Sequence, residues 1–324
     1  MIAHHGAELA QLAETNDVQF LFESAVAGGI PAVKTLREGL AGNRITRVAG
    51  ILNGTCNYIL STMETTGRDF EAVLADAQDL GYAEAEPSFD VDGIDAAHKL
   101  TILAAIAFGH KPDFNAVSIK GIRDVSSVDF AYANQLGFRI KLVGVAEPGL
   151  TPRMETCLLP LTSQLAKVNG VLNAVEFHGE PVGSVLAVGP GAGGGATSSA
   201  VLSDLIDIAT GRGGLPFGRS VYTLVDANAV ENCAGPDKPF YLRLMVVDQP
   251  GVLATLTGIL QKYSISVEGL LQQGRAPGNA VALVMTTHET SVADLGIALD
   301  EMEKLPIVKA KPVAMPIILA DKEM

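Results

Sequence analysis

The sequence of 324 residues contains no tryptophan, few other aromatic residues and only three cysteines. The cysteines, Cys56, Cys157 and Cys233, are odd in number and form no CxxC pair. Such usage argues against a disulfide framework or a zinc site and fits a reducing cytoplasm. The chain also lacks any apolar run of the roughly 18 residues that a membrane span requires, and its first residues do not resemble a secretion signal.

Positive charge is scarce: the chain has 23 Lys and Arg residues but 36 Asp and Glu residues, which gives a net charge of -13. A nucleic-acid partner or an anionic membrane surface would require a basic face, so neither is expected. Hydrophobic residues make up 48% of the chain and charged residues 18%, which suffices for packed cores in two domains. The composition leaves small-molecule chemistry as the default function.

The most informative stretch, residues 81–108, runs from a series of carboxylates into a helix that is apolar on nearly every side. Asp95 and Lys99 are four residues apart in it and therefore share one face of the helix. At the edge of a core, such a pair suits proton transfer or the binding of a zwitterion. The alternative is a solvated ion pair that only stabilises the helix.

A calcium loop built on Asp90, Asp92 and Asp95 is a second alternative. Its spacing is wrong, since glycine stands at the fourth position (Gly93) instead of the sixth, and the twelfth position holds Thr101 instead of a glutamate. The stretch therefore does not support a calcium site.

Asn53, Gly54 and Thr55 form a candidate ligand-binding turn after a predicted strand over residues 45–52. Turns from a strand into a helix commonly present free backbone N–H groups to a ligand. Simple capping of the helix by Asn53 or Thr55 is the alternative. An earlier apolar run, residues 18–22, is also expected to form a buried strand.

A glycine-rich turn places Gly189, Gly191 and Gly194 in GxGxxG spacing between a predicted strand and a predicted helix. A dinucleotide fingerprint also requires an acidic residue about 20 positions further on, and residues 212–220 contain none. We interpret the turn as a phosphate contact at a helix N-terminus. Close packing of the helix on its strand is the alternative.

After a Gly- and Pro-containing boundary at residues 235–239, the pattern predicts strand, helix, strand, strand, helix and strand. This βαββαβ order is typical of a ferredoxin-like unit, whose last strand is expected over residues 308–318. The segment DQPGVLATLTGIL resembles the DxPGxLxxLxxxL motif of ACT domains. That resemblance implies effector binding at Asp248, Gln249, Gly251 and Val252, with helix entry alone as the alternative.

Four motifs in one order, FESAVAGGIP, NGTCNYI, the acidic stretch and GPGAGGGAT, resemble the catalytic region of homoserine dehydrogenases. The family pattern GYxExxP…D…DxxxK is matched by Gly81, Tyr82, Glu84, Pro87, Asp90, Asp95 and Lys99. The resemblance implies an α/β fold with a mixed-sheet catalytic domain over residues 1–234, followed by an ACT domain over residues 235–324.

The resemblance also implies a role for each matched residue. Lys99 would donate and accept the proton at the reacting oxygen, with Asp95 and Glu84 holding the polar groups of homoserine and Asp90 supporting the site. The other implied positions form three sets: Gly54, Thr55 and Tyr82 line the substrate pocket; Gly81, Gly191 and Gly193 contact the cofactor; Glu23, Val26, Gly28 and Ile30 bind a sodium-like ion.

The implied reaction is NAD(P)H-dependent reduction of L-aspartate 4-semialdehyde to L-homoserine, in the biosynthesis of threonine, methionine and isoleucine. The implied protein is a cytoplasmic homo-oligomer, dimer or tetramer, regulated by threonine. The residues agree with this chemistry, because Lys99 can stabilise and protonate the oxygen that hydride transfer leaves negative, and no side chain carries hydride itself. A noncatalytic amino-acid-sensing fragment is the alternative.

The N-terminal Rossmann half of the family is expected to be mostly missing, with remnants at residues 1–22 and 185–212. We therefore expect a truncated chain that binds NADP or NAD poorly and turns over negligibly by itself. The residues that select between the two cofactors would lie in the missing half.

Overall fold

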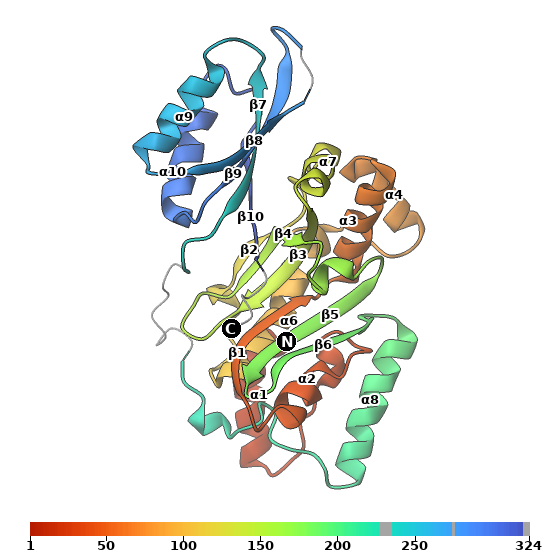
Figure 1. Ribbon diagram of the computed structural model, residues 1–324. Coiled ribbons are helices and arrows are strands. Elements are labelled where there is room, and N and C mark those ends of the chain that lie inside the picture. Colours follow the sequence, from red (N-terminus) through yellow and green to blue (C-terminus); the bar gives the residue numbers. More distant parts are fainter. Residues whose placement is uncertain (227–234, 274–275, 320–324) are drawn as a thin grey trace. The chain divides into compact units, whose positions relative to one another are not determined.

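The computed structural model describes residues 1–226, 235–273 and 276–319. Cys233 and residue 234, the predicted end of the first domain, lie outside them. The chain divides into two units, each built from separate parts of the sequence (Figure 1). Unit 1 comprises Met1–Arg123, Lys141–Glu155 and Lys167–Cys233, and unit 2 comprises Asp124–Ile140, Thr156–Ala166 and Ala234–Met324. None of the helices in the described residues has the length and apolar character needed to cross a membrane.

A mixed sheet contains six strands in the order β2-β4-β3-β1-β5-β6. β2 pairs with β4 in parallel, whereas β1 pairs antiparallel with β3 and with β5, and β5 pairs antiparallel with β6. The mixed sheet expected from the sequence is therefore confirmed. The strands are β1 (Arg44–Ile51), β2 (Ser118–Lys120), β3 (Phe138–Ala146), β4 (Arg153–Pro160), β5 (Leu172–Glu180) and β6 (Gly183–Pro190).

The predicted core helix is α6 (Ile94–Phe108), which packs against β1 in unit 1 (Figure 1). Nine of its residues are buried, because an almost wholly apolar helix gains free energy only when it is surrounded by protein. The other helices described in this unit are α1 (Ile2–Thr15), η1 (Glu23–Ala25), α2 (Ala32–Lys34), η2 (Thr35–Gly39), α3 (Gly54–Thr66), α4 (Phe70–Asp79), α5 (Ser88–Val91), η3 (Phe114–Ala116), α8 (Gly194–Ala209) and η5 (Val221–Thr223).

The strand expected over residues 18–22 is wrong. These residues form no regular element, and η1 follows them directly. Phe22 is nevertheless buried, with its ring centroid 5.5 Å from that of Phe20 and 5.6 Å from that of Phe217. The aromatic side chains of this apolar run are therefore buried by packing on each other and on Phe217, without strand pairing. The periodicity of the sequence does not distinguish these two ways of burying apolar residues.

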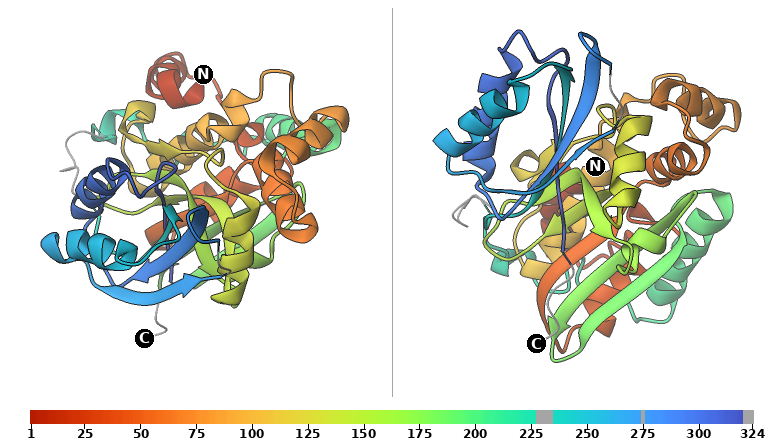
Figure 2. Two further views of the ribbon diagram at one scale, coloured as in Figure 1. Left: turned by 90° about the horizontal axis from the view of Figure 1, so that it is seen from above. Right: turned by 45° about the horizontal axis from the view of Figure 1, so that its top comes forward.

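Unit 2 contains a four-stranded antiparallel sheet in the order β10-β7-β9-β8, with two helices on one face (Figures 1 and 2). Buried side chains of the sheet and of both helices form one core cluster. The expected βαββαβ order is confirmed, although the last strand is shorter than residues 308–318. The elements are β7 (Phe240–Val247), α9 (Val252–Lys262), β8 (Val267–Gln272), β9 (Ala280–Thr287), α10 (Val292–Glu303) and β10 (Val313–Pro316).

Helix α7 (Ser127–Gln135), from the middle of the chain, belongs to unit 2 and is joined to β7 by a buried polar network. The carboxylate of Asp129 accepts hydrogen bonds from Arg243 Nε at 2.7 Å and from Tyr241 Oη at 2.9 Å. The other carboxylate oxygen accepts from the backbone N–H of Ser126 at 2.8 Å. Asp129 is fully buried, so these bonds replace the water that its charge gives up.

Candidate active site

Asn53 joins two of the predicted site carboxylates. It is the N-cap of α3, where its Oδ1 accepts a hydrogen bond from the backbone N–H of Cys56 at 2.8 Å. Its Nδ2 donates to Asp90 Oδ1 at 2.7 Å and to Asp95 Oδ2 at 2.9 Å. The capping interpretation is therefore confirmed, but the same side chain also holds the acidic cluster. The sequence offered no signal for this second role.

Lys99 and Asp95 form the centre of the cluster on α6. Lys99 Nζ lies 2.6 Å from Asp95 Oδ2 and donates to the carbonyl oxygen of Leu52 at 3.0 Å. An ammonium carries three N–H groups, so within the described residues one remains for a ligand oxygen. The side chains of Lys99 and Asp95 are 18% and 24% exposed. The pair is therefore more enclosed than the solvated ion pair considered as the alternative, but a ligand can still reach it.

Burial changes the acidity of the groups beside this pair. It raises the pKa of Asp90, an effect opposed by the hydrogen bond from Asn53 and reinforced by the charge of Asp95. Burial also raises the pKa of the Cys56 thiol well above its ordinary value, with the Asp90 charge adding to the effect. The thiol is therefore neutral and donates to the backbone oxygen of Asp90 at 3.2 Å. Cys56 thus supports the position of Asp90 and is not a nucleophile.

The residues predicted to line the substrate pocket lie around the N-terminus of α3. At Gly54 a Cβ atom would be only 2.6 Å from the carbonyl oxygen of Val171, so the helix can approach β5 only with glycine there. Thr55 Oγ1 donates to the backbone oxygen of Tyr82 at 2.6 Å, which ties the turn after α4 to α3. Gly81, at the end of α4, has φ +75°, a conformation that favours glycine.

The side chain of Glu84, a predicted substrate residue, is not bonded to the cluster in the part of the chain that the structure describes. Its side chain is exposed, and in the described part of the chain its carboxylate forms no ion pair with Lys99. Its charge still contributes to the raised pKa of Asp90, which places it near the cluster. Glu84 is thus available to a positively charged ligand group.

The glycine-rich turn links β6 to α8, as the sequence predicts. Gly193 is the N-cap of α8 with φ +105°, and the first N–H groups of a helix have no partners within it. A Cβ atom at Gly191 would be 2.1 Å from the side-chain amide of Asn173. A Cβ atom at Gly28 would be 3.3 Å from the carbonyl oxygen of Gly191. The structure therefore brings the predicted cofactor turn and the predicted ion loop into contact.

Asn173 is a candidate site residue that sequence reasoning missed. It lies on β5 and is 1% exposed, yet its Oδ1 has no hydrogen-bond partner among the described residues. The amide lies between Gly191 of the predicted cofactor turn and Gly54 of the predicted substrate turn. A buried carboxamide oxygen without a partner is unusual in a native protein and calls for an explanation.

The predicted ion loop contains Glu23, Val26, Gly28 and Ile30, and all four residues are buried. Glu23 is buried, and its carboxylate accepts from the backbone N–H groups of Val33 at 3.0 Å and Lys34 at 2.9 Å. Burial raises the pKa of Glu23 to about 7, against the effect of these two hydrogen bonds. A sodium-like ion would be bound by backbone oxygens of this loop, and its presence stays a prediction.

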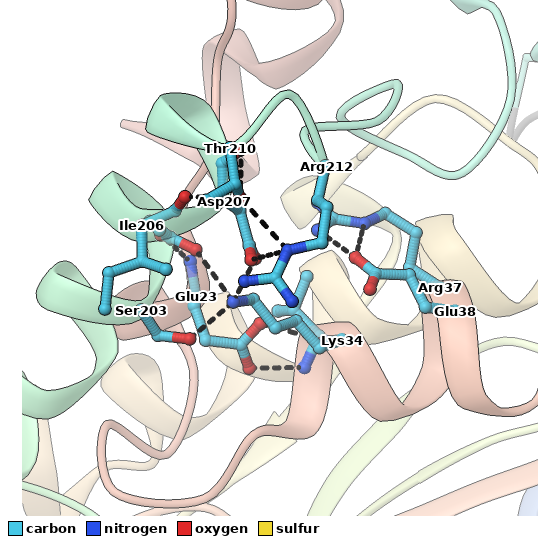
Figure 3. A network of polar contacts seen from close by, with 11 residues as sticks. Glu23, Lys34, Arg37, Glu38, Ser203, Ile206, Asp207, Thr210 and Arg212 are labelled. Atoms are coloured by element: carbon cyan, nitrogen blue, oxygen red, sulfur yellow. Dashed lines mark hydrogen bonds and ion pairs between the residues drawn. The ribbon is translucent and has the colours of Figure 1, made fainter.

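A charged cluster anchors α8 to this loop (Figure 3). Lys34 contacts Ser203 and Asp207 of α8, and the backbone N–H of Glu23 donates to Asp204 at 2.9 Å. Apolar residues of α8 lie on its outer face instead, where Leu202, Leu205 and Ile206 are all more than half exposed. The helix that follows the glycine turn is therefore fixed by charge on one side and leaves an apolar surface on the other.

The predicted effector loop of unit 2 lies between β7 and α9. Asp248 Oδ2 accepts the backbone N–H of Ala276 at 2.9 Å, so this carboxylate stabilises the neighbouring turn. Gly251 is the N-cap of α9 with φ +89°, and Val252 is the first, buried residue of the helix. Gln249 donates its backbone N–H to the oxygen of Val247 at 3.0 Å. The loop is well ordered by its own bonds, and effector binding there stays a prediction.

Two family models match the chain. The model for homoserine dehydrogenase covers residues 31–206, and the ACT domain model covers residues 240–307. The first match contains the whole cluster around Asn53 and Lys99 and the glycine turn.

Known proteins resemble the chain over nearly its full length. A homoserine dehydrogenase of Pseudomonas aeruginosa is 43% identical over 96% of this chain and 75% of its own length, and one of Neisseria gonorrhoeae is 42% identical over 97% and 74%. The crystal structure of a homoserine dehydrogenase from Thiobacillus denitrificans has a TM-score of 0.88 at 41% identity, covering 98% of this chain and 74% of that one.

A hyperthermophilic archaeal homoserine dehydrogenase mutant in complex with NADPH is also similar, with a TM-score of 0.58 and 32% identity over 65% of this chain and 61% of that one. Homoserine dehydrogenases are NAD(P)-dependent oxidoreductases that act on a CH–OH group. From the family matches, the identities and the shared fold, we conclude that this chain belongs to the homoserine dehydrogenase family and carries a C-terminal ACT domain.

Proposed function

We propose that the protein interconverts L-aspartate 4-semialdehyde and L-homoserine with NAD(P)H or NAD(P)⁺, in the pathway to threonine, methionine and isoleucine. The observation that carries this proposal is the cluster of Lys99, Asp95, Asp90 and Asn53, which presents one ammonium and two carboxylates at the N-terminal end of a buried helix. Such a cluster suits a substrate that is itself a zwitterion.

Lys99 acts at the reacting oxygen. The nicotinamide cofactor supplies the hydride, which no side chain can carry. As negative charge develops on the aldehyde oxygen, the free N–H of Lys99 stabilises it and then transfers a proton; the alcohol loses its proton to neutral Lys99 in the reverse direction. Asp95 and the carbonyl oxygen of Leu52 hold the ammonium in place through the two bonds at 2.6 and 3.0 Å.

The substrate ammonium binds to Glu84 and Asp95, with Asp90 supporting the site from the other side of Asn53. Gly54, Thr55 and Tyr82 line the pocket around the N-terminus of α3. The support for this assignment is the shared bonding of the two aspartates to Asn53 and the exposed, uncommitted carboxylate of Glu84.

The residues present fit a dinucleotide at the glycine turn. Around Gly193, which has φ +105°, no atom of the described residues lies within 4 Å of a Cβ position, so the backbone there is open to a ligand. The N-terminus of α8 offers its first N–H groups to a phosphate, and Gly191 and Gly81 complete the set. The apolar outer face of α8 supports our proposal that residues 185–212 pack against a nucleotide-binding region. The division of the chain into a catalytic domain up to residue 234 and an ACT domain after it is also part of this proposal.

The test is hydride transfer by the full-length gene product. We expect L-homoserine to reduce NADP⁺ or NAD⁺ with an absorbance rise at 340 nm, whereas L-serine, one methylene shorter, reacts at least about tenfold more slowly because its hydroxyl falls short of Lys99. Calorimetry of the 324-residue chain with L-homoserine measures the substrate site separately. Absence of turnover in the gene product, together with effector binding to the ACT domain, would favour the amino-acid-sensing alternative.

We further propose that L-threonine binds at the loop formed by Asp248, Gln249, Gly251 and Val252 and regulates the enzyme. We expect saturable heat on titration with L-threonine, and about tenfold weaker binding to Asp248→Ala, which loses the bond to Ala276 that orders the loop. Asp294→Ala, an exposed carboxylate on α10 of the same unit, is the matched control and should bind as the wild type does. Equal affinity in both variants would place the effector elsewhere.

Three further properties belong to this proposal. A sodium-like ion binds backbone oxygens of Glu23, Val26, Gly28 and Ile30, which follow one another on a single loop. The protein is a homo-oligomer, dimer or tetramer. It works in the cytoplasm, a location that suits the free buried thiols of Cys56 and Cys157.

A further inference from the structure

We propose that the side-chain amide of Asn173 binds the nicotinamide riboside end of NAD(P)H and so positions the cofactor against the substrate. This inference rests on the proposed dehydrogenase function. It assigns a role to Asn173, for which the resemblance to the family implied none. It makes Asn173 a cofactor-binding residue at the junction of the two predicted half-sites.

The first support is the unpaired carboxamide oxygen of Asn173. Asn173 is 1% exposed, and its Oδ1 is buried without a hydrogen-bond partner in the described residues. Burying such a group without a partner is unfavourable, and native proteins rarely leave it so. Asn57, on the adjacent helix, shows the usual situation: its Nδ2 donates to Val168 and Leu172, and its Oδ1 accepts from Lys141 at 2.9 Å.

The second support is the place of the amide. Asn173 pairs with Gly189 in the β5–β6 register, so its side chain stands beside the glycine turn that follows β6. A Cβ atom at Gly191 would be 2.1 Å from Asn173 Nδ2, and one at Gly54 would be 3.4 Å from Asn173 Oδ1. The glycines on both sides thus let the cofactor turn and the substrate turn approach the amide closely, which places it between the two predicted half-sites.

The chemistry of the amide fits one part of the cofactor. A carboxamide offers an acceptor and donors at once, which matches a ribose hydroxyl or the nicotinamide carboxamide, since each of them also donates and accepts. The phosphates, which only accept, are better served by the N–H groups at the start of α8. Of the parts of a dinucleotide, the nicotinamide riboside must approach the substrate turn, because hydride passes between them.

The test is titration of NADPH into the full-length gene product and its Asn173→Ala variant, followed by nicotinamide fluorescence. We expect the dissociation constant to rise at least about tenfold in the variant. We also expect the urea midpoint to stay unchanged or to rise, because the substitution removes a buried unpaired group. Asn57→Ala is the matched control: this amide is equally buried but fully bonded, so the midpoint should fall.

The outcomes separate the inference from the proposed function. If the wild type binds NADPH and Asn173→Ala binds it equally well, Asn173 has no role in cofactor binding and the inference is overturned. A lower urea midpoint for Asn173→Ala with unchanged affinity would assign the amide a structural role and would also overturn it. If the wild type itself binds no NADPH, the proposed function fails first and the inference fails with it.

Discussion

Replacing Lys99 by alanine in the full-length gene product is expected to lower kcat for homoserine oxidation by about 10²- to 10⁴-fold, while the protein stays folded. The loss is large because Lys99 alone among the clustered groups is a cation that can stabilise and protonate the reacting oxygen. Folding should survive, because alanine is a strong helix former and the lost ion pair is partly exposed.

The measurement is steady-state kinetics at 340 nm together with a circular dichroism melt. Lys111→Ala is the control: this lysine is exposed and pairs with Asp226 at 2.8 Å, so its removal should change kcat less than twofold. A Lys99→Ala enzyme that keeps its kcat and loses only affinity for homoserine would show that Lys99 binds the substrate and does not transfer the proton.

The centre of the site could be predicted from the sequence because its members are close together in the chain. Asp95 and Lys99 are one helical turn apart, and the apolar residues that follow them indicate a buried helix. The spacing therefore predicts both the pair and its partial burial. The N-cap role of Asn53 is just as local, since it depends only on the turn between β1 and α3.

The contacts that complete the site could not be predicted, because they depend on the pairing of distant strands. Asn53 meets Asp95 from 42 positions away, and Asn173 reaches Gly191 only through the register of β5 with β6. A shift of one residue in that register would turn Asn173 to the other face of the sheet. No local pattern of residues carries this information.

The same limit applies to the fold of unit 2. The βαββαβ pattern follows from hydrophobic periodicity, but nothing in that pattern indicates that Asp129 of α7 lies against β7. The two segments are 114 residues apart in the chain. Their association depends on a buried charge network, which hydrophobic periodicity does not reveal.

Arg243→Met, which breaks this network, is expected to lower the free energy of unfolding by about 3 to 5 kcal/mol. The substitution leaves the fully buried Asp129 carboxylate without its cationic partner. Tyr241 cannot compensate, because burial, followed by the charge of Asp129, raises the pKa of its hydroxyl far above the ordinary value and keeps it neutral. Urea denaturation followed by circular dichroism measures the loss.

The double variant Asp129→Leu, Arg243→Met distinguishes a lost charge partner from lost packing. Removing both charges relieves the unpaired carboxylate, so the double variant should recover much of the stability that Arg243→Met loses. Lys262→Met, which breaks the exposed pair with Glu301 on the other side of the same unit, should cost no more than about 1 kcal/mol. If the double variant were as unstable as the sum of the two single ones, the pair would contribute through packing alone, and the buried charge would not explain the attachment of α7 to β7.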